Sequence, residues 1–290
     1  MREGVITKGV GGFYYVAENG VIHVCRAAGV LRTRKIKPAV GDRVLFEDED
    51  HGDMYITDIK ERENYIKRPP AANVDQIILV FAVKEPDADY LLLDKLLIDG
   101  AMNGIPTALC VTKCDLAEER DLEFIREHYS AAVTDIVFTS SVNGMGLEEI
   151  RSRMEGRLSL LRGVSGAGKT SLLNALCPHA ERQTGELSRK LKRGKNTTRH
   201  SELMMMDSES FILDTPGFSD FEPDDLDEDE LWKYYPEFYE YSVCRYMNCV
   251  HINEPECGIK EALREGKISS LRYGNYKKLY AILKKNRRWQ

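Results

Sequence analysis

The sequence lacks any apolar run that approaches the ~18 residues of a membrane-spanning helix. Its first residues, MREGVITKGVGG, have no apolar core of the kind that a secretory signal peptide carries. Internal repeats and low-complexity linkers are also missing. These absences argue against a membrane-embedded or exported protein. We therefore expect a cytoplasmic globular protein with no membrane partner. The sequence leaves the oligomeric state open, and a monomer is the default expectation.

The chain also lacks a cysteine pattern that would suit a disulfide framework, because seven is an odd number and no export signal precedes them. Four cysteines are scattered and are expected to be small buried side chains, namely Cys25, Cys110, Cys114 and Cys177. The other three form a cluster with one histidine: Cys244, Cys249, His251 and Cys257. Three thiolates and one imidazole are a complete tetrahedral set for one structural Zn²⁺, with no position left open for catalysis.

An overall excess of positive charge is absent as well, since the formal net charge is −6. This argues against bulk affinity for nucleic acid. The charges are nevertheless segregated, with basic segments at 182–200 and 260–290 and an acidic segment at 220–230. Such segregation permits local phosphate-binding faces on an acidic protein, although solvated helix faces would give the same pattern.

Residues 1–66 read as about five short strands separated by Gly-Gly and Asn-Gly turn signals. Short strands without helical periodicity predict a small antiparallel barrel of OB-fold size. A basic loop, LRTRKIKP at 31–38, lies between strands where such barrels often meet oligonucleotides. The expected RNA-binding residues of this loop are Arg32, Arg34, Lys35 and Lys37.

From about residue 70 the pattern alternates between apolar strand segments and helical segments, which predicts a mostly parallel α/β sheet. After residue 220 the strands end, and both the acidic stretch 224–242 and the basic stretch 270–289 look helical. We therefore predict three domains: an OB-fold RNA-binding domain at 1–66, an α/β domain at 67–221, and a mainly helical zinc-binding domain at 222–290.

A glycine-rich loop, GVSGAGKTS at 163–171, lies between a predicted strand and a predicted helix and matches the phosphate-loop pattern G-x-x-x-x-G-K-[ST]. Its backbone N–H groups and the helix N-terminus would bind phosphate oxygens. Lys169 would reach the β- and γ-phosphates, and the Thr170 hydroxyl would ligate Mg²⁺. The expected nucleotide-binding residues here are Gly163, Val164, Ser165, Gly166, Ala167, Gly168, Lys169, Thr170 and Ser171.

Three further segments complete a guanine-nucleotide site. Asp214 ends an apolar strand in DTPG, so it could hold Mg²⁺ through water while the Gly217 N–H senses the γ-phosphate. The motif TKCD comprises Thr112, Lys113, Cys114 and Asp115. Its aspartate could accept hydrogen bonds from the N1–H and the exocyclic amine of guanine. The loop that begins with Ser140 and Ser141 resembles the one that closes over the base.

The order of these segments along the chain is unusual for a GTPase. The base motif and the base loop come first, and the phosphate loop and DTPG follow, whereas ordinary GTPases begin with the phosphate loop. The order predicts a circularly permuted P-loop GTPase domain, a change that is tolerated when the ends of a domain lie close together at its surface. The segment after Asp214 then leads directly into the C-terminal domain.

With these motifs the sequence resembles the ribosome small subunit-dependent GTPase family (RsgA/YjeQ type). The likeness spans nearly the whole chain and includes GGFYYV, VGDRV, KRPPAANVDQ, GVSGAGKTS, DTPGF and the cysteine cluster. It implies an OB-fold, a permuted GTPase domain and a zinc domain. It also implies hydrolysis of GTP to GDP and phosphate, stimulated by the small (30S) ribosomal subunit and its 16S rRNA during late subunit maturation.

The sequence departs from the usual pattern of this family in two motifs. Thr112 stands where the base motif usually has asparagine, and Asn196 stands where the first switch motif usually has the histidine suspected of a role in hydrolysis. His200 is nearby but displaced, and we prefer Thr198 to Thr197 as the magnesium ligand. Phe218 replaces the water-orienting glutamine of many GTPases and has no hydrogen-bonding group. Intrinsic hydrolysis is therefore expected to be slow and to depend on a partner.

Two other functional classes remain open from the sequence. One is a P-loop kinase or ATPase that acts on a small molecule, against which the base motif TKCD counts. The other is a non-catalytic RNA-binding module whose nucleotide site only gates assembly. Slow basal turnover is expected of both this module and a partner-dependent GTPase, so only stimulated turnover separates them.

Overall fold

The computed structural model describes residues 1–33, 37–48, 53–177, 202–214 and 226–287. The chain divides into two compact units. The first comprises Met1–Ile78, Gly146–Arg162 and Lys169–Gly217, and the second comprises Leu79–Met145, Gly163–Gly168 and Phe218–Gln290. No helix among the described residues is long and apolar enough to cross a membrane.

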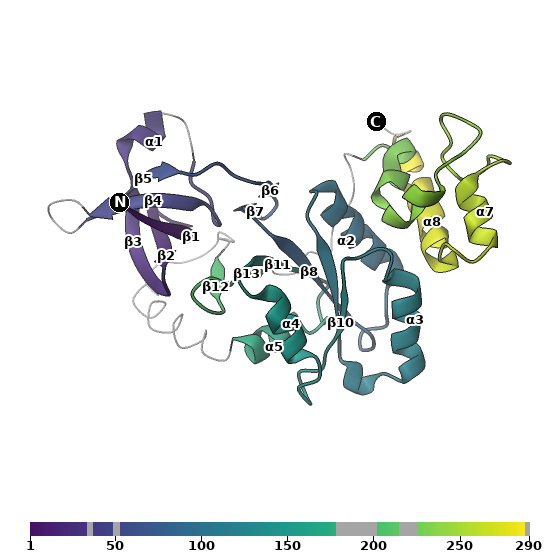
Figure 1. The fold of residues 1–290 in the computed structure, drawn as a ribbon, viewed down its shortest axis with the longest axis horizontal. Helices are drawn as coiled ribbons and strands as arrows, with labels where there is room; N and C mark the ends of the chain where they lie inside the picture. Colours follow the sequence, from purple (N-terminus) through teal and green to yellow (C-terminus); the bar gives the residue numbers. More distant parts are fainter. Residues whose placement is uncertain (34–36, 49–52, 178–201, 215–225, 288–290) are drawn as a thin grey trace. The chain divides into compact units, whose positions relative to one another are not determined.

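A closed five-stranded barrel forms the N-terminal part of the first unit (Figure 1). Its strands are β1 (Arg2–Val10), β2 (Phe13–Glu18), β3 (Val21–Ala27), β4 (Arg43–Asp48) and β5 (Met54–Ile59), in the order β1-β2-β3-β5-β4. The turn β2–β3 uses Asn19 and Gly20, both with positive φ, as tight hairpin turns require. Ile6, Val16 and Phe46 fill the barrel core. The predicted OB-type barrel is confirmed, but it is not wholly antiparallel, because β3 and β5 pair in parallel.

The first half of the segment predicted as a basic loop is helical in the structure. Residues Gly29–Thr33 form the short helix α1, so Arg32 lies in a helix and not in a loop. The reason is packing, because Leu31 is fully buried in the barrel core, which the helix turn allows. Lys37 is exposed, and Arg34 and Lys35 lie outside the described residues.

A two-stranded hairpin follows the barrel, made of β6 (Tyr65–Lys67) and β7 (Pro70–Ala72). Next in the chain is β8 (Gln76–Ala82), a strand whose residues are all buried. The sheet that contains it has the order β10-β9-β8-β11-β13-β12. The other strands are β9 (Thr107–Thr112), β10 (Ile136–Phe138), β11 (Leu158–Arg162), β12 (Leu203–Met205) and β13 (Phe211–Asp214).

The strand pairing agrees with the predicted α/β class. β10 pairs with β9 and β11 pairs with β13 in parallel, whereas β12 is antiparallel to its neighbour β13. All residues of β9 and β11 are buried, which explains why apolar residues predominate in these strands. The helices are α2 (Tyr90–Met102), η1 (Cys114–Leu116), α3 (Glu119–Tyr129), α4 (Leu147–Met154) and α5 (Lys169–Leu176).

The C-terminal part contains the 3₁₀ helices η2 (Glu228–Tyr234) and η3 (Pro236–Tyr241), followed by α7 (Gly258–Arg264) and α8 (Ser270–Arg287). The described part of the acidic stretch 224–242 is helical, as expected, and it forms two short 3₁₀ helices. Tyr235 is extended, and Pro236 begins the next helical turn without an N–H to continue the preceding one. The aromatic residues Tyr235, Phe238 and Tyr276 are fully buried in the core of this region.

Candidate functional site

The base motif TKCD lies at the carboxyl end of β9, within the second unit. Lys113 adopts the left-handed conformation, with φ of 59°, and the single turn η1 then carries Asp115. The hydroxyl of buried Ser140 donates a hydrogen bond to Oδ1 of Asp115. Asp115 and Ser141 are both exposed. The carboxylate is thus held in one orientation while it remains accessible, as an acceptor for a ligand must be.

The base motif is joined directly to the phosphate loop by Thr112. Its hydroxyl donates to the backbone carbonyl of Ala167 at 2.6 Å. This bond connects residues 55 positions apart in sequence, and both partners are buried. The close fit extends to Gly168, where an added Cβ would lie 3.3 Å from the Thr112 hydroxyl oxygen. The departure from asparagine at position 112 therefore leaves a side chain that still ties the two segments together.

The phosphate loop itself has a shape that its glycines dictate. Gly163 has a φ of 152°, and a Cβ there would lie 2.2 Å from the carbonyl oxygen of Val80. Gly168 has a φ of 87°, which also favours glycine. Ser165 and Gly166 are exposed at the tip, whereas Ala167 is buried. The loop thus presents its tip to solvent on a fixed base, and the helix α5 begins at Lys169 directly after it.

A segment that the sequence analysis did not single out also lines this region. Lys113 donates a hydrogen bond from Nζ to the backbone carbonyl of Glu85. Pro86 follows, and its Cδ would lie 3.4 Å from a Cβ placed on Gly166. The segment after β8 therefore supports both the base motif and the phosphate loop. Its polar sequence, KEPDAD, reads as an ordinary loop, so no signal pointed to it.

Within the first unit, Lys169 and Asp214 influence each other electrostatically. Burial lowers the pKa of Lys169, and the carboxylate of Asp214 opposes this shift. Asp214 ends β13, as expected, and Thr170 is exposed in the first turn of α5. A lysine and an acidic side chain beside a helix N-terminus can bind a phosphate group and the metal ion that accompanies it. Gly217, Asn196, Thr198 and His200 lie outside the described residues.

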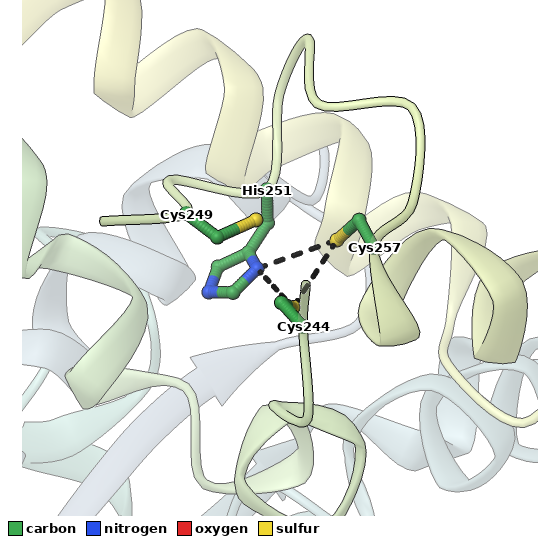
Figure 2. Close-up of side chains that lie close together, drawn as sticks. All are labelled: Cys244, Cys249, His251 and Cys257. Carbon is green, nitrogen blue, oxygen red and sulfur yellow. Dashed lines mark hydrogen bonds between the residues drawn. The ribbon is translucent and has the colours of Figure 1, made fainter. Parts of the chain in front are cut away.

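The four clustered Cys and His side chains converge in the second unit, as Figure 2 shows. The His251 Nδ1 atom lies 3.5 Å from Sγ of Cys244 and 3.4 Å from Sγ of Cys257, and these two sulfurs are 3.8 Å apart. The ligand atoms of all four residues, Cys249 included, lie within 4.8 Å of one another. Ligands ~2.3 Å from a tetrahedral zinc ion would be about 3.7 Å apart. The cluster could therefore hold a metal ion of this size.

The surroundings of the cluster fit the same interpretation. Burial raises the pKa of Cys249 to about 12, raises that of Cys257 and lowers that of His251. Burial thus favours the uncharged forms of all three, and a metal cation would supply the charge that thiolates need. Tyr273 and Tyr276 of α8 donate to the backbone carbonyls of His251 and Val250, which fixes this loop to the helix.

Two family sequence models together match most of the chain. The sequence model of the RsgA GTPase matches residues 59–224, and that of the RsgA N-terminal domain matches residues 3–56. A small ribosomal subunit biogenesis GTPase RsgA from Alkaliphilus metalliredigens is 41% identical over 292 residues, which cover 100% of both chains.

Two solved structures share the fold. The crystal structure of YjeQ from Thermotoga maritima matches with a TM-score of 0.83 and 35% identity, over 97% of this chain and 98% of that one. YloQ, described as a circularly permuted GTPase, matches with a TM-score of 0.82 and 35% identity, over 98% of this chain and 96% of its own. The permuted arrangement predicted from the motif order is confirmed by this likeness.

Proposed function

The chain belongs to the RsgA GTPase family and is a GTPase, and from this membership we propose that it acts on the small (30S) ribosomal subunit. It binds the subunit late in maturation, and the subunit stimulates hydrolysis of GTP to GDP and phosphate. The protein works as a cytoplasmic monomer that contacts 16S rRNA. The domain division at residues 66 and 221 belongs to the same proposal.

The observation that carries the nucleotide part is the hydrogen bond from Thr112 to Ala167. It ties the segment that would recognise the base to the loop that would bind the phosphates, so both ends of one nucleotide are met by a single fixed framework. In this proposal Asp115 accepts from guanine N1–H and the exocyclic amine, and Ser140 holds its carboxylate in place. Adenine offers no matching pair of donors, which gives the preference for GTP.

Other residues of the proposed site bind the phosphates of the nucleotide. Backbone N–H groups of the loop 163–168 and the N-terminus of α5 bind phosphate oxygens, and Lys169 neutralises their charge. Thr170, Thr198 and, through water, Asp214 would hold the Mg²⁺, which would neutralise the negative charge that develops on the phosphates. Because Asn196 can orient water but cannot take its proton, and Phe218 can do neither, the subunit must complete the site.

The remaining proposals concern Zn²⁺ and RNA. One structural Zn²⁺ is held by Cys244, Cys249, His251 and Cys257, whose ligand atoms converge within 4.8 Å. RNA is contacted by the basic segment Arg32, Arg34, Lys35 and Lys37, and by the exposed lysines of α8, which are Lys277, Lys278, Lys284 and Lys285. Such phosphate contacts weaken steeply as salt concentration rises.

The deciding experiment measures GTP hydrolysis by the purified protein alone, with small subunits and with large subunits, using ATP as the nucleotide control. We expect strong stimulation by small subunits with GTP only, since a completing group supplied in trans is worth ~10³–10⁵ in rate. Tight GTP binding without stimulation would contradict the proposal and would favour a nucleotide-gated binding module. Equal use of ATP would favour a kinase or ATPase.

The variant Asp115→Asn tests base recognition separately. It keeps the shape of the side chain but replaces an acceptor oxygen with a donor. We expect GTP affinity to fall by ~100-fold or more, because a buried donor of guanine would face another donor. An exposed carboxylate elsewhere, Glu119→Gln at the first position of α3, serves as the control and should leave affinity unchanged.

A further inference from the structure

Tyr65, the first residue of β6, is an aromatic side chain held in an exposed position. It is 45% exposed, although the guanidinium of Arg62 lies 4.8 Å from its ring centroid and covers one face. An exposed tyrosine usually loses rotamer freedom when it binds a partner, which reduces the gain in free energy. The contact with Arg62 restricts the Tyr65 ring before any partner arrives.

The Arg62 guanidinium is itself fixed. Its Nε and Nη2 atoms donate to the two carboxylate oxygens of Asp42 at 2.7 and 2.9 Å, and Nη2 also donates to the backbone carbonyl of Lys37 at 2.9 Å. Asp42 is fully buried and accepts a further hydrogen bond from the N–H of Ala39 at 2.7 Å. A bidentate arginine–carboxylate pair of this kind sets the plane of the guanidinium as well as its position.

The hairpin β6–β7 that carries Tyr65 is also attached firmly to the barrel. The Ala72 N–H donates to the Val40 carbonyl at 2.9 Å, and the Asn73 side chain donates to the Gly41 carbonyl at 3.0 Å. The approach is so close that a Cβ on Gly41 would lie 2.1 Å from the Ala72 carbonyl oxygen. The position of Tyr65 therefore follows from the barrel and does not depend on a loose loop.

Three exposed cations belong to the segments that hold the ring. Lys67 shares the exposed face of β6 with Tyr65, about 7 Å along the strand, while Ile66 between them is buried. Arg68 and Lys37 are exposed as well. Among the described residues none of these three cations has an acidic partner, whereas other cations of the barrel are paired, such as Arg43 with Glu63.

We propose that this surface, the Tyr65 platform (Arg62, Tyr65, Lys67, Arg68 and Lys37), binds a single-stranded RNA segment. A flat ring accepts an unpaired base by stacking, and neighbouring cations take the phosphates on either side of it. Duplex RNA is disfavoured because its bases are already stacked on one another. The proposal rests on the proposed function, in which the RNA of the small subunit is the partner.

The test measures binding of a fluorescein-labelled, single-stranded oligo(U) 12-mer to the full-length protein by fluorescence anisotropy. We expect Tyr65→Ala to weaken binding about 10-fold, because stacking of one base on one aromatic ring is worth ~1–3 kcal/mol. Tyr65→Phe keeps the ring and should bind as the wild type does. The double variant Lys67→Ala/Arg68→Ala should bind more weakly and show a shallower dependence on salt concentration.

Tyr246→Ala is the matched control, because Tyr246 is 44% exposed and lies outside the platform. If Tyr65→Ala binds the oligonucleotide as tightly as Tyr246→Ala does, or if the wild type does not bind it, the platform proposal is wrong. A short RNA duplex that competes as well as the single strand would also contradict it. Stimulation of wild-type GTP hydrolysis by small subunits is measured in parallel, so that failure of the platform and failure of the proposed function give different results.

Discussion

Arg272 of α8 donates a hydrogen bond from Nη1 to Oδ1 of Asp94 in α2 at 2.7 Å, and the two side chains are only 1% and 0% exposed. The same guanidinium donates to both carboxylate oxygens of Glu237 in η3, at 2.7 and 3.1 Å. One cation therefore joins α2, the helix that follows β8, to two helices of the C-terminal region. Burial raises the pKa of Asp94, and the charge of Arg272 opposes that shift.

We expect Arg272→Met to lower the free energy of unfolding by about 3–5 kcal/mol, because it leaves two buried carboxylates without their cation. Urea unfolding of the purified variant measures this loss. Arg287→Met, in the last turn of the same helix, removes an exposed cation from its pairs with Asp227 and Glu228 and is the control. Equal unfolding midpoints for the two variants would show that the buried network does not hold α2 to α8.

The second prediction concerns Thr112. Thr112→Val keeps the shape of the side chain but removes the hydroxyl that donates to Ala167. Because one hydrogen bond contributes ~0.5–1.5 kcal/mol, we expect affinity for a fluorescent GDP analogue to fall by about 2- to 10-fold. Thr107→Val removes a similar hydroxyl at the other end of β9, where it donates to Ile105, and should leave affinity unchanged. Identical affinities of both variants would refute a role for this bond.

Much of the fold was predictable because local patterns report burial. The fully buried strands β8, β9 and β11 are mainly apolar, and the barrel strands are short runs between turn residues, so each is visible in a short window of sequence. The helix α1 was missed, and the division of the acidic stretch into two 3₁₀ helices was not predicted, because tertiary packing decides both. Leu31 turns inward into the barrel, and Tyr235 leaves the helical conformation before Pro236.

Some residues of the candidate site could be predicted from the sequence, and others could not. The residues of the phosphate loop and the metal cluster follow from motif spacing, since the chemistry requires them near one another in the chain. The contacts Thr112–Ala167, Lys113–Glu85 and Arg272–Asp94 join segments that are 55, 28 and 178 residues apart. No local pattern records such pairs, and Glu85 participates only through its backbone carbonyl, which any residue has.

The third prediction tests the metal cluster through Trp232, whose ring lies 5.3 Å from that of His251 at an angle of 82°. In a Trp289→Phe background Trp232 is the only tryptophan, because the chain has two. Cys249→Ala should lose bound zinc, change the Trp232 fluorescence and unfold residues 240–265, while GTP binding is retained. Structural zinc contributes ~10–16 kcal/mol in small modules. Cys25→Ala, which removes a buried cysteine of the barrel, should keep both zinc and fluorescence. Retention of zinc by Cys249→Ala would contradict the ligand assignment.

The last prediction is a pH dependence at the turn between β12 and β13. Burial alone would raise the pKa of Asp207, but the Ser210 hydroxyl and the N–H groups of Glu209 and Ser210 all donate to its carboxylate and lower the pKa below its usual value. A carboxyl group whose pKa is lowered by folding stabilises the folded state above its unfolded pKa, near 3.8, and loses that contribution as pH falls through its folded pKa.

The wild type should therefore be more stable than Asp207→Asn at pH 7, and the difference should shrink as the pH falls below about 4. Thermal unfolding of both proteins between pH 3 and pH 7 measures it, with Glu209→Gln, an exposed carboxylate of the same turn, as the control. A difference that stays constant over this range would mean that the side-chain shape of Asp207, and not its charge, holds the turn.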